Sequence, residues 1–280
     1  MAARNVQLLI IDPQNDFMDR PGAALPVAGA MADMARLAAV IDAAGASISG
    51  ITLTLDSHHS VGIERPAFWQ KADGSDVAPF TQVSAAQVRA GEFVPRGAGG
   101  RDRALAYLDA LEARGRYRLM VWPVHCEIGT WGHNVQEDLR AAYNRWERET
   151  LQPVRKVFKG MNAWTEMYSA LQAEVPDPQD PETELNRRLV ARLDEADLVV
   201  VAGEASSHCV RATTEHLVES LPSGRAGKVM LLADCMSPVA GFEAEATAFL
   251  QAMAARGVRV AAAKDLVAEL ARQAKSTTAG

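Results

Sequence analysis

The sequence predicts an α/β protein, a single three-layer domain whose mostly parallel sheet carries helices on both faces. First, strand-like runs alternate with amphipathic, helix-like segments along most of the chain, as in repeated βαβ units. Second, the run LVVVAG at residues 198–203 is continuous and β-branched, which is typical of a strand buried on both faces. Third, 280 residues with 48% hydrophobic content can bury a sizeable core, near the upper size for one domain.

The elements follow from short apolar runs and from apolar residues at helical spacing. The strand candidates are residues 6–12, 47–56, 118–123, 154–160, 198–204, 229–235 and 258–263. The amphipathic segments between them are residues 26–45, 101–115, 133–149, 184–196, 242–257 and a helix that starts at Cys209, with Ser206 or Ser207 as its N-cap. Right-handed crossovers would join the parallel strands.

Two segments interrupt this alternation. Residues 61–100 contain prolines, glycines and aromatic side chains, and they predict an insertion over the edge of the sheet. Residues 174–184 form a proline-rich acidic loop. We therefore expect one domain over residues 1–280 with an insertion at about 61–100.

Composition excludes several classes of partner. The net charge of -6 arises from 29 basic and 35 acidic residues mixed along the chain, so no basic stripe favours nucleic acid or a membrane surface. No apolar stretch reaches the ~20 residues of a membrane helix. Three cysteines are too few for a disulfide framework and predict a reducing, cytoplasmic environment. The expected partners are a small molecule and further copies of the chain, as a homo-oligomer.

Cys209 lies in the first turn of a helix that directly follows the buried strand at 198–203. Free backbone N–H groups and the helix dipole favour a thiolate there, which suits a nucleophile. A small buried cysteine that seats the helix on the sheet explains the same local sequence.

Further polar side chains stand at the ends of the predicted strands. Because the carboxyl ends of parallel strands meet at one edge of a sheet, we expect them in one cleft. They are Asp12 after the first strand, Asp56 and His58 after the second, His125 after the third, Lys159 after the fourth and Cys209 after the fifth. Singly, each aspartate could be a helix N-cap and each basic residue a loop side chain.

As a set, these residues support two kinds of chemistry. A thiol, a carboxylate and an amine supply a nucleophile, a proton carrier and a stabilising cation, namely Cys209, Asp12 and Lys159. One carboxylate and two imidazoles supply ligands for a catalytic metal, namely Asp56, His58 and His125. The second set also resembles the two-histidine, one-carboxylate triad of non-haem iron oxygenases, which keeps that enzyme class open.

In combination, these motifs resemble the isochorismatase-like cysteine hydrolase superfamily and, within it, the nicotinamidases. The resemblance extends from Val6 to about Pro238 and is carried by LLIIDPQNDF, LTLDSHH, WPVHCEIGTWG, KGMNAWTEMYSAL and GEASSHCV. It implies a six-stranded parallel sheet, a catalytic triad of Asp12, Lys159 and Cys209, and one divalent metal ion, zinc with iron or manganese as alternatives, on Asp56, His58 and His125.

The resemblance also implies how a substrate is held. Phe17 and Trp122 would sandwich an aromatic ring, with Tyr168 also in the binding site. A cis peptide would join Glu204 to Ala205, and the backbone N–H groups of Ala205 and Cys209 would form an oxyanion hole.

The function implied is amide hydrolysis through a thioester, with nicotinamide and water giving nicotinate and ammonia. Another amidase of the same superfamily, acting on a ureido, carbamoyl or maleamate-type substrate, is the nearest alternative, because the insertion could reshape the cleft. An inactive binding protein is the third. We further expect His133 at the start of a surface helix rather than as a polar wall group of the cleft. We expect His59 and Glu64 as exposed loop side chains rather than extra metal contacts, and Cys126 and Cys235 as structural residues.

Overall fold

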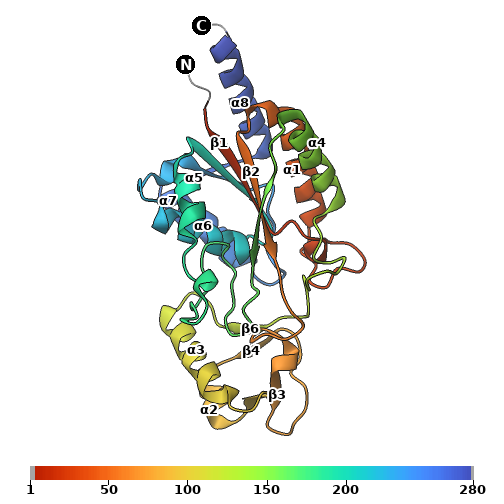
Figure 1. The fold of residues 1–280 in the computed structure, drawn as a ribbon, viewed down its shortest axis with the longest axis vertical. Coiled ribbons are helices and arrows are strands. Elements are labelled where there is room, and N and C mark those ends of the chain that lie inside the picture. Colours follow the sequence, from red (N-terminus) through yellow and green to blue (C-terminus); the bar gives the residue numbers. More distant parts are fainter. Residues whose placement is uncertain (1–3, 279–280) are drawn as a thin grey trace.

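The computed structural model describes residues 4–278, and its centre is a six-stranded parallel sheet (Figure 1). The strand order is β10-β9-β8-β1-β2-β7, and every pairing in this sheet is parallel. The strands are β1 (Val6–Ile11), β2 (Gly50–Asp56), β7 (Arg155–Lys159), β8 (Leu198–Gly203), β9 (Val229–Leu232) and β10 (Arg259–Ala261). The predicted α/β class and six-stranded parallel sheet are confirmed.

Helices cover the sheet on both faces (Figure 1). On one face α1 packs against α4 and α8, and on the other α6 packs against α7. The long helices are α1 (Ala30–Ala44), α4 (Glu137–Thr150), α5 (Arg187–Asp194), α6 (Cys209–Ser220), α7 (Glu243–Ala255) and α8 (Ala263–Thr278). Short 3₁₀ helices occupy Asn15–Phe17, Gly45–Ser47, Pro66–Phe68, Pro181–Thr183 and Ala226–Lys228. The α8 helix was not among the predicted segments.

The strands of the sheet centre are apolar because both of their faces are covered. All six residues of β8 are buried, and five of six in β1, which pairs with β8 from Val6 to Ile11. These side chains join the helices in one large hydrophobic cluster. The β7 strand, at the sheet edge, is mostly exposed until it reaches Lys159.

A second group of elements lies beyond one end of the sheet, at the bottom of Figure 1. It consists of β3 (Trp69–Lys71), β4 (Thr81–Val83), α2 (Ala85–Ala90), β5 (Phe93–Pro95), α3 (Gly100–Arg114) and β6 (Leu119–Val121). It has its own hydrophobic cluster, with members from Ile63 to Val121. Within it β3 pairs with β5, and β4 pairs with β6, both antiparallel.

This group corrects one prediction. The run at 118–123 was expected to be a strand of the parallel sheet, but its strand, β6, pairs only with β4 outside that sheet. A short apolar run predicts a strand without specifying its partner, which here is β4, within residues 61–100.

Among residues 4–278, no helix is both long enough and apolar enough to cross a membrane.

Candidate active site

The parallel register brings the polar strand ends together. Asp56 and Lys159 are direct register partners at the ends of β2 and β7, and Asp12 follows the last residue of β1, the strand on the other side of β2. Cys209 begins α6 just after β8, which also borders β1. The predicted meeting of these four side chains at one sheet edge is therefore what the fold produces.

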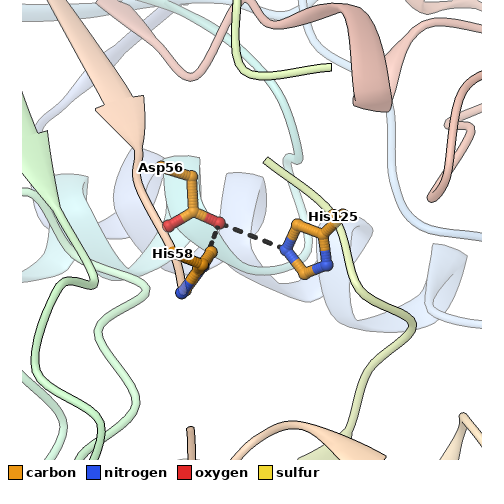
Figure 2. Close-up of side chains that lie close together, drawn as sticks. All are labelled: Asp56, His58 and His125. Carbon is orange, nitrogen blue, oxygen red and sulfur yellow. Dashed lines mark hydrogen bonds and ion pairs between the residues drawn. The ribbon is translucent and has the colours of Figure 1, made fainter. Parts of the chain in front are cut away.

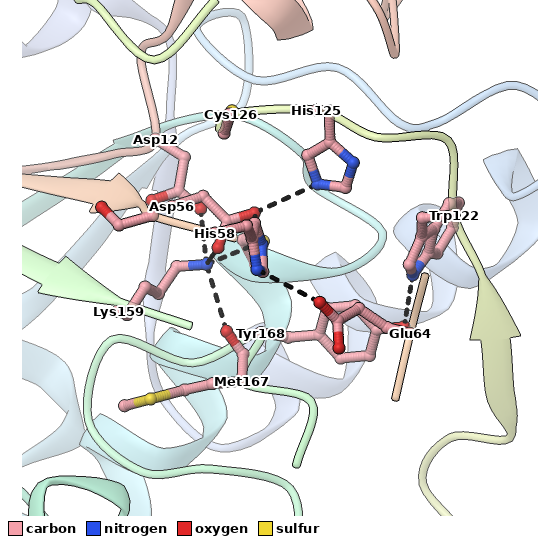
Figure 3. A network of polar contacts seen from close by, with 12 residues as sticks. Asp12, Asp56, His58, Glu64, Trp122, His125, Cys126, Lys159, Met167 and Tyr168 are labelled. Carbon is pink, nitrogen blue, oxygen red and sulfur yellow. Dashed lines mark hydrogen bonds and ion pairs between the residues drawn. The ribbon is translucent and has the colours of Figure 1, made fainter. Parts of the chain in front are cut away.

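Lys159 is the centre of this group (Figure 3). Its Nζ lies 2.9 Å from Asp12 Oδ2 and 2.9 Å from Asp56 Oδ1, and it donates to the Met167 carbonyl at 3.2 Å and towards Cys209 Sγ at 3.5 Å. Its side chain is completely buried, as is that of Asp12. Burial alone would lower the pKa of this amine, but the carboxylates of Asp12 and Asp56 raise it well above its ordinary value, so Lys159 is a cation.

Two hydrogen bonds with Thr54, on the neighbouring strand β2, hold Asp12 in place. Thr54 Oγ1 on β2 donates to Asp12 Oδ1 at 2.5 Å and accepts from the Asp12 backbone N–H at 3.0 Å. Burial raises the pKa of the Asp12 carboxyl, Lys159 opposes that rise, and Asp56 adds to it. A carboxyl with a raised pKa can both accept and return a proton.

The pKa of the Cys209 thiol differs from the prediction made from its helix position, which favoured a thiolate. Burial raises its pKa well above the ordinary value, Lys159 lowers it, and Asp12 and Asp56 raise it further. The helix terminus and the lysine thus do not overcome burial and two carboxylates, and the resting group is a thiol. The α6 N-cap is His208 without a side-chain cap bond, so neither Ser206 nor Ser207 has the predicted capping role.

Asp56, His58 and His125 form a compact set of possible metal ligands (Figure 2). Asp56 Oδ2 lies 2.8 Å from His58 Nε2 and 3.3 Å from His125 Nε2, and one ligand atom from each residue lies within 4.8 Å of the others. All three residues are buried. Gly160 has φ 82°, and a Cβ there would come 2.8 Å from His58 Cε1, so a glycine is needed where the chain passes this set.

The donor set fits a divalent ion. One carboxylate oxygen and two imidazole nitrogens are ordinary ligands for zinc and for other first-row metals. Burial opposes ionisation of Asp56, yet His58 and Lys159 hold its pKa well below the ordinary value. Burial would lower the pKa of His58, but Asp56 raises it to about 9, whereas burial and Arg65 lower that of His125 to about 4. The set therefore holds a proton that a metal ion would replace.

Glu64 and Arg65 surround these histidines, and sequence reasoning missed this. Glu64 was expected to be exposed, but its side chain is buried, with Oε1 3.4 Å from His58 Nδ1 and 3.1 Å from Arg65 Nε. Arg65, fully buried, places Nη1 2.7 Å from the Pro123 carbonyl and 2.8 Å from His125 Nδ1. A charged pair in a loop gives no sequence signal for burial. His59, in contrast, is exposed as predicted.

A pocket opens beside Cys209 and encloses about 360 Å³ between atoms, its mouth included. The Nε1 of Trp122 donates to the Tyr168 hydroxyl at 3.0 Å, which fixes both rings. The lining residues are Phe17, Leu25, Asp56, Trp122, His125, Glu166, Tyr168, Ala205, His208, Cys209 and Val239. The structure thus brings every predicted substrate-binding residue to the thiol. Leu25, Glu166, His208 and Val239 were not anticipated from sequence.

Two of the unanticipated residues are polar. Glu166 is buried, its Oε2 has no hydrogen-bond partner among the described residues, and burial together with Glu64 raises its pKa to about 8. The Nδ1 of His208 lies 2.9 Å from Ser207 Oγ, and burial lowers the pKa of this imidazole to about 4. Both therefore present largely uncharged groups to the pocket at neutral pH.

The backbone at the start of α6 offers donors to the pocket. The peptide between Glu204 and Ala205 is cis, as expected. Among the described residues, no acceptor is found for the backbone N–H of Ala205 or of Cys209. Paired N–H groups without acceptors beside a nucleophile are suited to binding an oxyanion.

The remaining candidates lie outside this pocket. Cys126 and Cys235 are buried, and the Cys126 backbone N–H donates to Asp16 at 2.6 Å, in keeping with structural roles. The prediction for His133 is wrong, because α4 begins at Glu137 and His133 is half-buried with Nε2 2.9 Å from Ser57 Oγ.

Comparison with known proteins places this geometry in context. No family model matches the chain, and no curated protein matches it. A nicotinamidase/pyrazinamidase of Acinetobacter baumannii is 21% identical, with a TM-score of 0.63 over 94% of this chain and 98% of its own. The yeast nicotinamidase bound to the inhibitor nicotinaldehyde is 19% identical, with a TM-score of 0.64 over 92% and 99%. The pyrazinamidase of Pyrococcus horikoshii in complex with zinc is 19% identical, with a TM-score of 0.54 over 92% and 99%. The chain thus has the fold shared by nicotinamidases, pyrazinamidases and isochorismatase-family hydrolases.

Proposed function

We propose that the protein is a metal-containing cysteine amidohydrolase that converts nicotinamide and water to nicotinate and ammonia. One observation carries the proposal: Lys159 Nζ contacts Asp12, Asp56 and Cys209 in one buried group. That contact joins a nucleophile and its proton carrier to a set of possible metal ligands, and the pocket opens onto both. The names of the proteins that share the fold support an amide substrate.

The first half of the reaction releases ammonia. Asp12 accepts the proton of Cys209, and the thiolate attacks the amide carbon to give a tetrahedral oxyanion. Lys159 stabilises the anions of both residues as the charge moves. When the C–N bond breaks, Asp12 returns the proton to the leaving nitrogen, which departs as ammonia and leaves a thioester on Cys209.

The second half regenerates the enzyme. Asp12 takes a proton from water, and the resulting hydroxide attacks the thioester carbon. The C–S bond then breaks to release the carboxylic acid, and the Cys209 thiolate recovers the proton from Asp12. In both halves the oxyanion would accept from the backbone N–H groups of Ala205 and Cys209. Such a donor contributes roughly 3 to 4 kcal/mol to the transition state of other hydrolases.

The pocket walls favour a planar ring that carries a nitrogen lone pair. Phe17 and Trp122 supply apolar ring faces, and Tyr168 holds the Trp122 indole in place through its hydroxyl. A divalent ion, zinc by preference, held by Asp56, His58 and His125 would supply a Lewis-acid site for the pyridine nitrogen. The iron oxygenase alternative is disfavoured because it assigns no task to Cys209 and Lys159, which adjoin the same ligands.

A comparison of amides tests the proposal. Ammonia release would be measured for nicotinamide, benzamide, an aliphatic amide and a ureido compound, with Cys209→Ala as the control for contaminating amidases. We expect kcat/KM for nicotinamide to exceed that for benzamide at least about tenfold, or about 1.4 kcal/mol of transition-state stabilisation. Equal values, or turnover only of the aliphatic or ureido compound, would discard the nicotinamide assignment and leave a cysteine amidohydrolase of another specificity.

A further inference from the structure

Glu204 is a buried acid that the proposed mechanism does not use. It directly precedes Ala205, which lines the pocket and whose backbone N–H is a proposed oxyanion donor, and the Glu204 side chain is completely buried. A second acid, Asp33 on α1, is also buried, with 2% of its surface exposed. Both side chains accept hydrogen bonds from the same residue, Ser237, in the loop after β9.

Ser237 is hydrogen-bonded to the residues before and after Ala205, namely Glu204 and Ser206. Its backbone N–H donates to Glu204 Oε2 at 3.1 Å, and its carbonyl accepts from the Ser206 N–H at 2.8 Å. On the opposite side, the Glu204 N–H donates to the carbonyl of Ile11 at 2.8 Å. The residues before and after Ala205 are therefore tied to β1 and to the Ser237 loop, which fixes the direction of the Ala205 N–H.

The two acids differ in their hydrogen-bond donors. Asp33 Oδ1 accepts from Arg36 Nη2 at 2.5 Å, and its Oδ2 accepts from the Ser237 hydroxyl at 2.5 Å. Glu204 Oε2 accepts from the Ser237 N–H, whereas its Oε1 accepts from no donor among the described groups. A buried carboxyl oxygen without a donor favours the protonated form, so the geometry favours a neutral Glu204.

We propose that Glu204, by accepting from the Ser237 N–H, is a positioning residue that holds the Ala205 N–H towards the oxyanion. The inference rests on the proposed function, because it assigns the Glu204 side chain a part in the same hydrolysis. Glu204 touches no reacting atom; it acts through the backbone that it anchors.

The charged surroundings of Glu204 predict how the anchor responds to pH. Burial raises the pKa of its carboxyl well above the ordinary value, and Asp33 and Asp19 raise it further. Arg36, on α1, is a cation near these acids, and its guanidinium is paired with Asp33. When alkaline pH removes the proton of Glu204, a buried negative charge with one free oxygen is left beside Asp33, and the anchor should loosen. The contribution of Glu204 to stability is full below its unfolded pKa and falls as pH rises through its folded pKa.

Two substitutions separate the anchor from simple packing. Glu204→Gln can still accept from the Ser237 N–H and stays neutral at every pH, whereas Glu204→Leu cannot accept that hydrogen bond. Glu174→Gln is the matched control, since Glu174 is a buried acid with a raised pKa, about 7, that does not contact the Ser237 loop. We expect Glu204→Leu to lower kcat at least about tenfold with KM within about threefold, because a misplaced catalytic donor acts on the chemical step. Glu204→Gln and Glu174→Gln should stay within about threefold of wild type.

Amide hydrogen exchange supplies a readout that does not depend on substrate. Protection factors for residues 203–209 would be measured from pH 6 to pH 10 in wild type, Glu204→Gln and Glu174→Gln. Protection should fall at alkaline pH in wild type and in the control but not in Glu204→Gln. Equal pH dependence in wild type and Glu204→Gln would overturn the proposal even if Glu204→Leu does not fold, as would unchanged kcat in a folded Glu204→Leu. If wild type hydrolyses no amide, the proposed function fails, while the exchange data still decide whether Glu204 anchors the loop.

Discussion

Replacing Lys159 by methionine tests whether one cation holds the two carboxylates together. Methionine retains much of the buried volume but removes the charge that lies 2.9 Å from both Asp12 and Asp56. At an effective dielectric constant of about 20, each pair gains roughly 6 kcal/mol of Coulomb energy, much of which is offset by desolvation of the ions. Loss of one partner from a buried pair typically destabilises a protein by about 3 to 5 kcal/mol. We expect a loss in that range at pH 7, together with loss of amide hydrolysis.

Urea denaturation of metal-free protein measures this free energy of unfolding. Lys156→Met is the matched control, because Lys156 lies on the same strand but is exposed, so its loss should change stability by less than about 0.5 kcal/mol. The Asp12→Asn and Lys159→Met double variant should lose much less stability and activity than the sum of the single losses, since the two residues form one unit. A loss below about 1 kcal/mol for Lys159→Met, or additive effects in the cycle, would refute the reasoning.

Three further outcomes follow from the same geometry. Cys209→Ala should abolish ammonia release while circular dichroism and thermal unfolding stay near wild type; retained turnover would exclude the thiol as nucleophile. His58→Ala should lose bound metal, measured by elemental analysis, and lose activity, yet keep Cys209 reactive towards iodoacetamide; full metal content would show that the ligand assignment is wrong. Because burial raises the pKa of Cys209 well above its ordinary value, alkylation of the free enzyme should be slow at pH 7 and accelerate above pH 9; a rate that is already maximal at pH 7 would contradict a resting thiol.

The sequence predicted which polar side chains meet at one edge of the sheet, because parallel strands impose that meeting. Once the runs that end at Asp12, Asp56 and Lys159 are recognised as neighbouring strands, their carboxyl ends must meet, whatever the loops do. The helix that carries Cys209 follows the same rule, since it begins directly after β8. Short apolar runs were sufficient to predict β1, β2 and β8 because these strands are buried almost throughout.

What the sequence could not supply depends on contacts between distant loops. The burial of Glu64 and Arg65 requires His58 and His125 to be in place first, and a short charged loop is ordinarily exposed. The raised pKa of Cys209 likewise depends on total burial, which outweighs a helix terminus that is visible in the sequence. The strand β6 was assigned to the wrong sheet because its partner belongs to the insertion.

The separate hydrophobic cluster of Ile63 to Val121 has a consequence for how this protein can change in evolution. Trp122 directly follows β6, and its backbone N–H donates to the Glu64 carbonyl. Phe80 packs edge-on against the Trp122 ring, with the ring centroids 5.9 Å apart. One wall of the pocket is therefore supported by this second group of elements, whereas Asp12 follows β1, Lys159 ends β7 and Cys209 begins α6. Substitutions in that group can shift the wall without disturbing Asp12, Lys159 and Cys209. Selection can therefore act separately on the pocket wall and on the groups proposed to react.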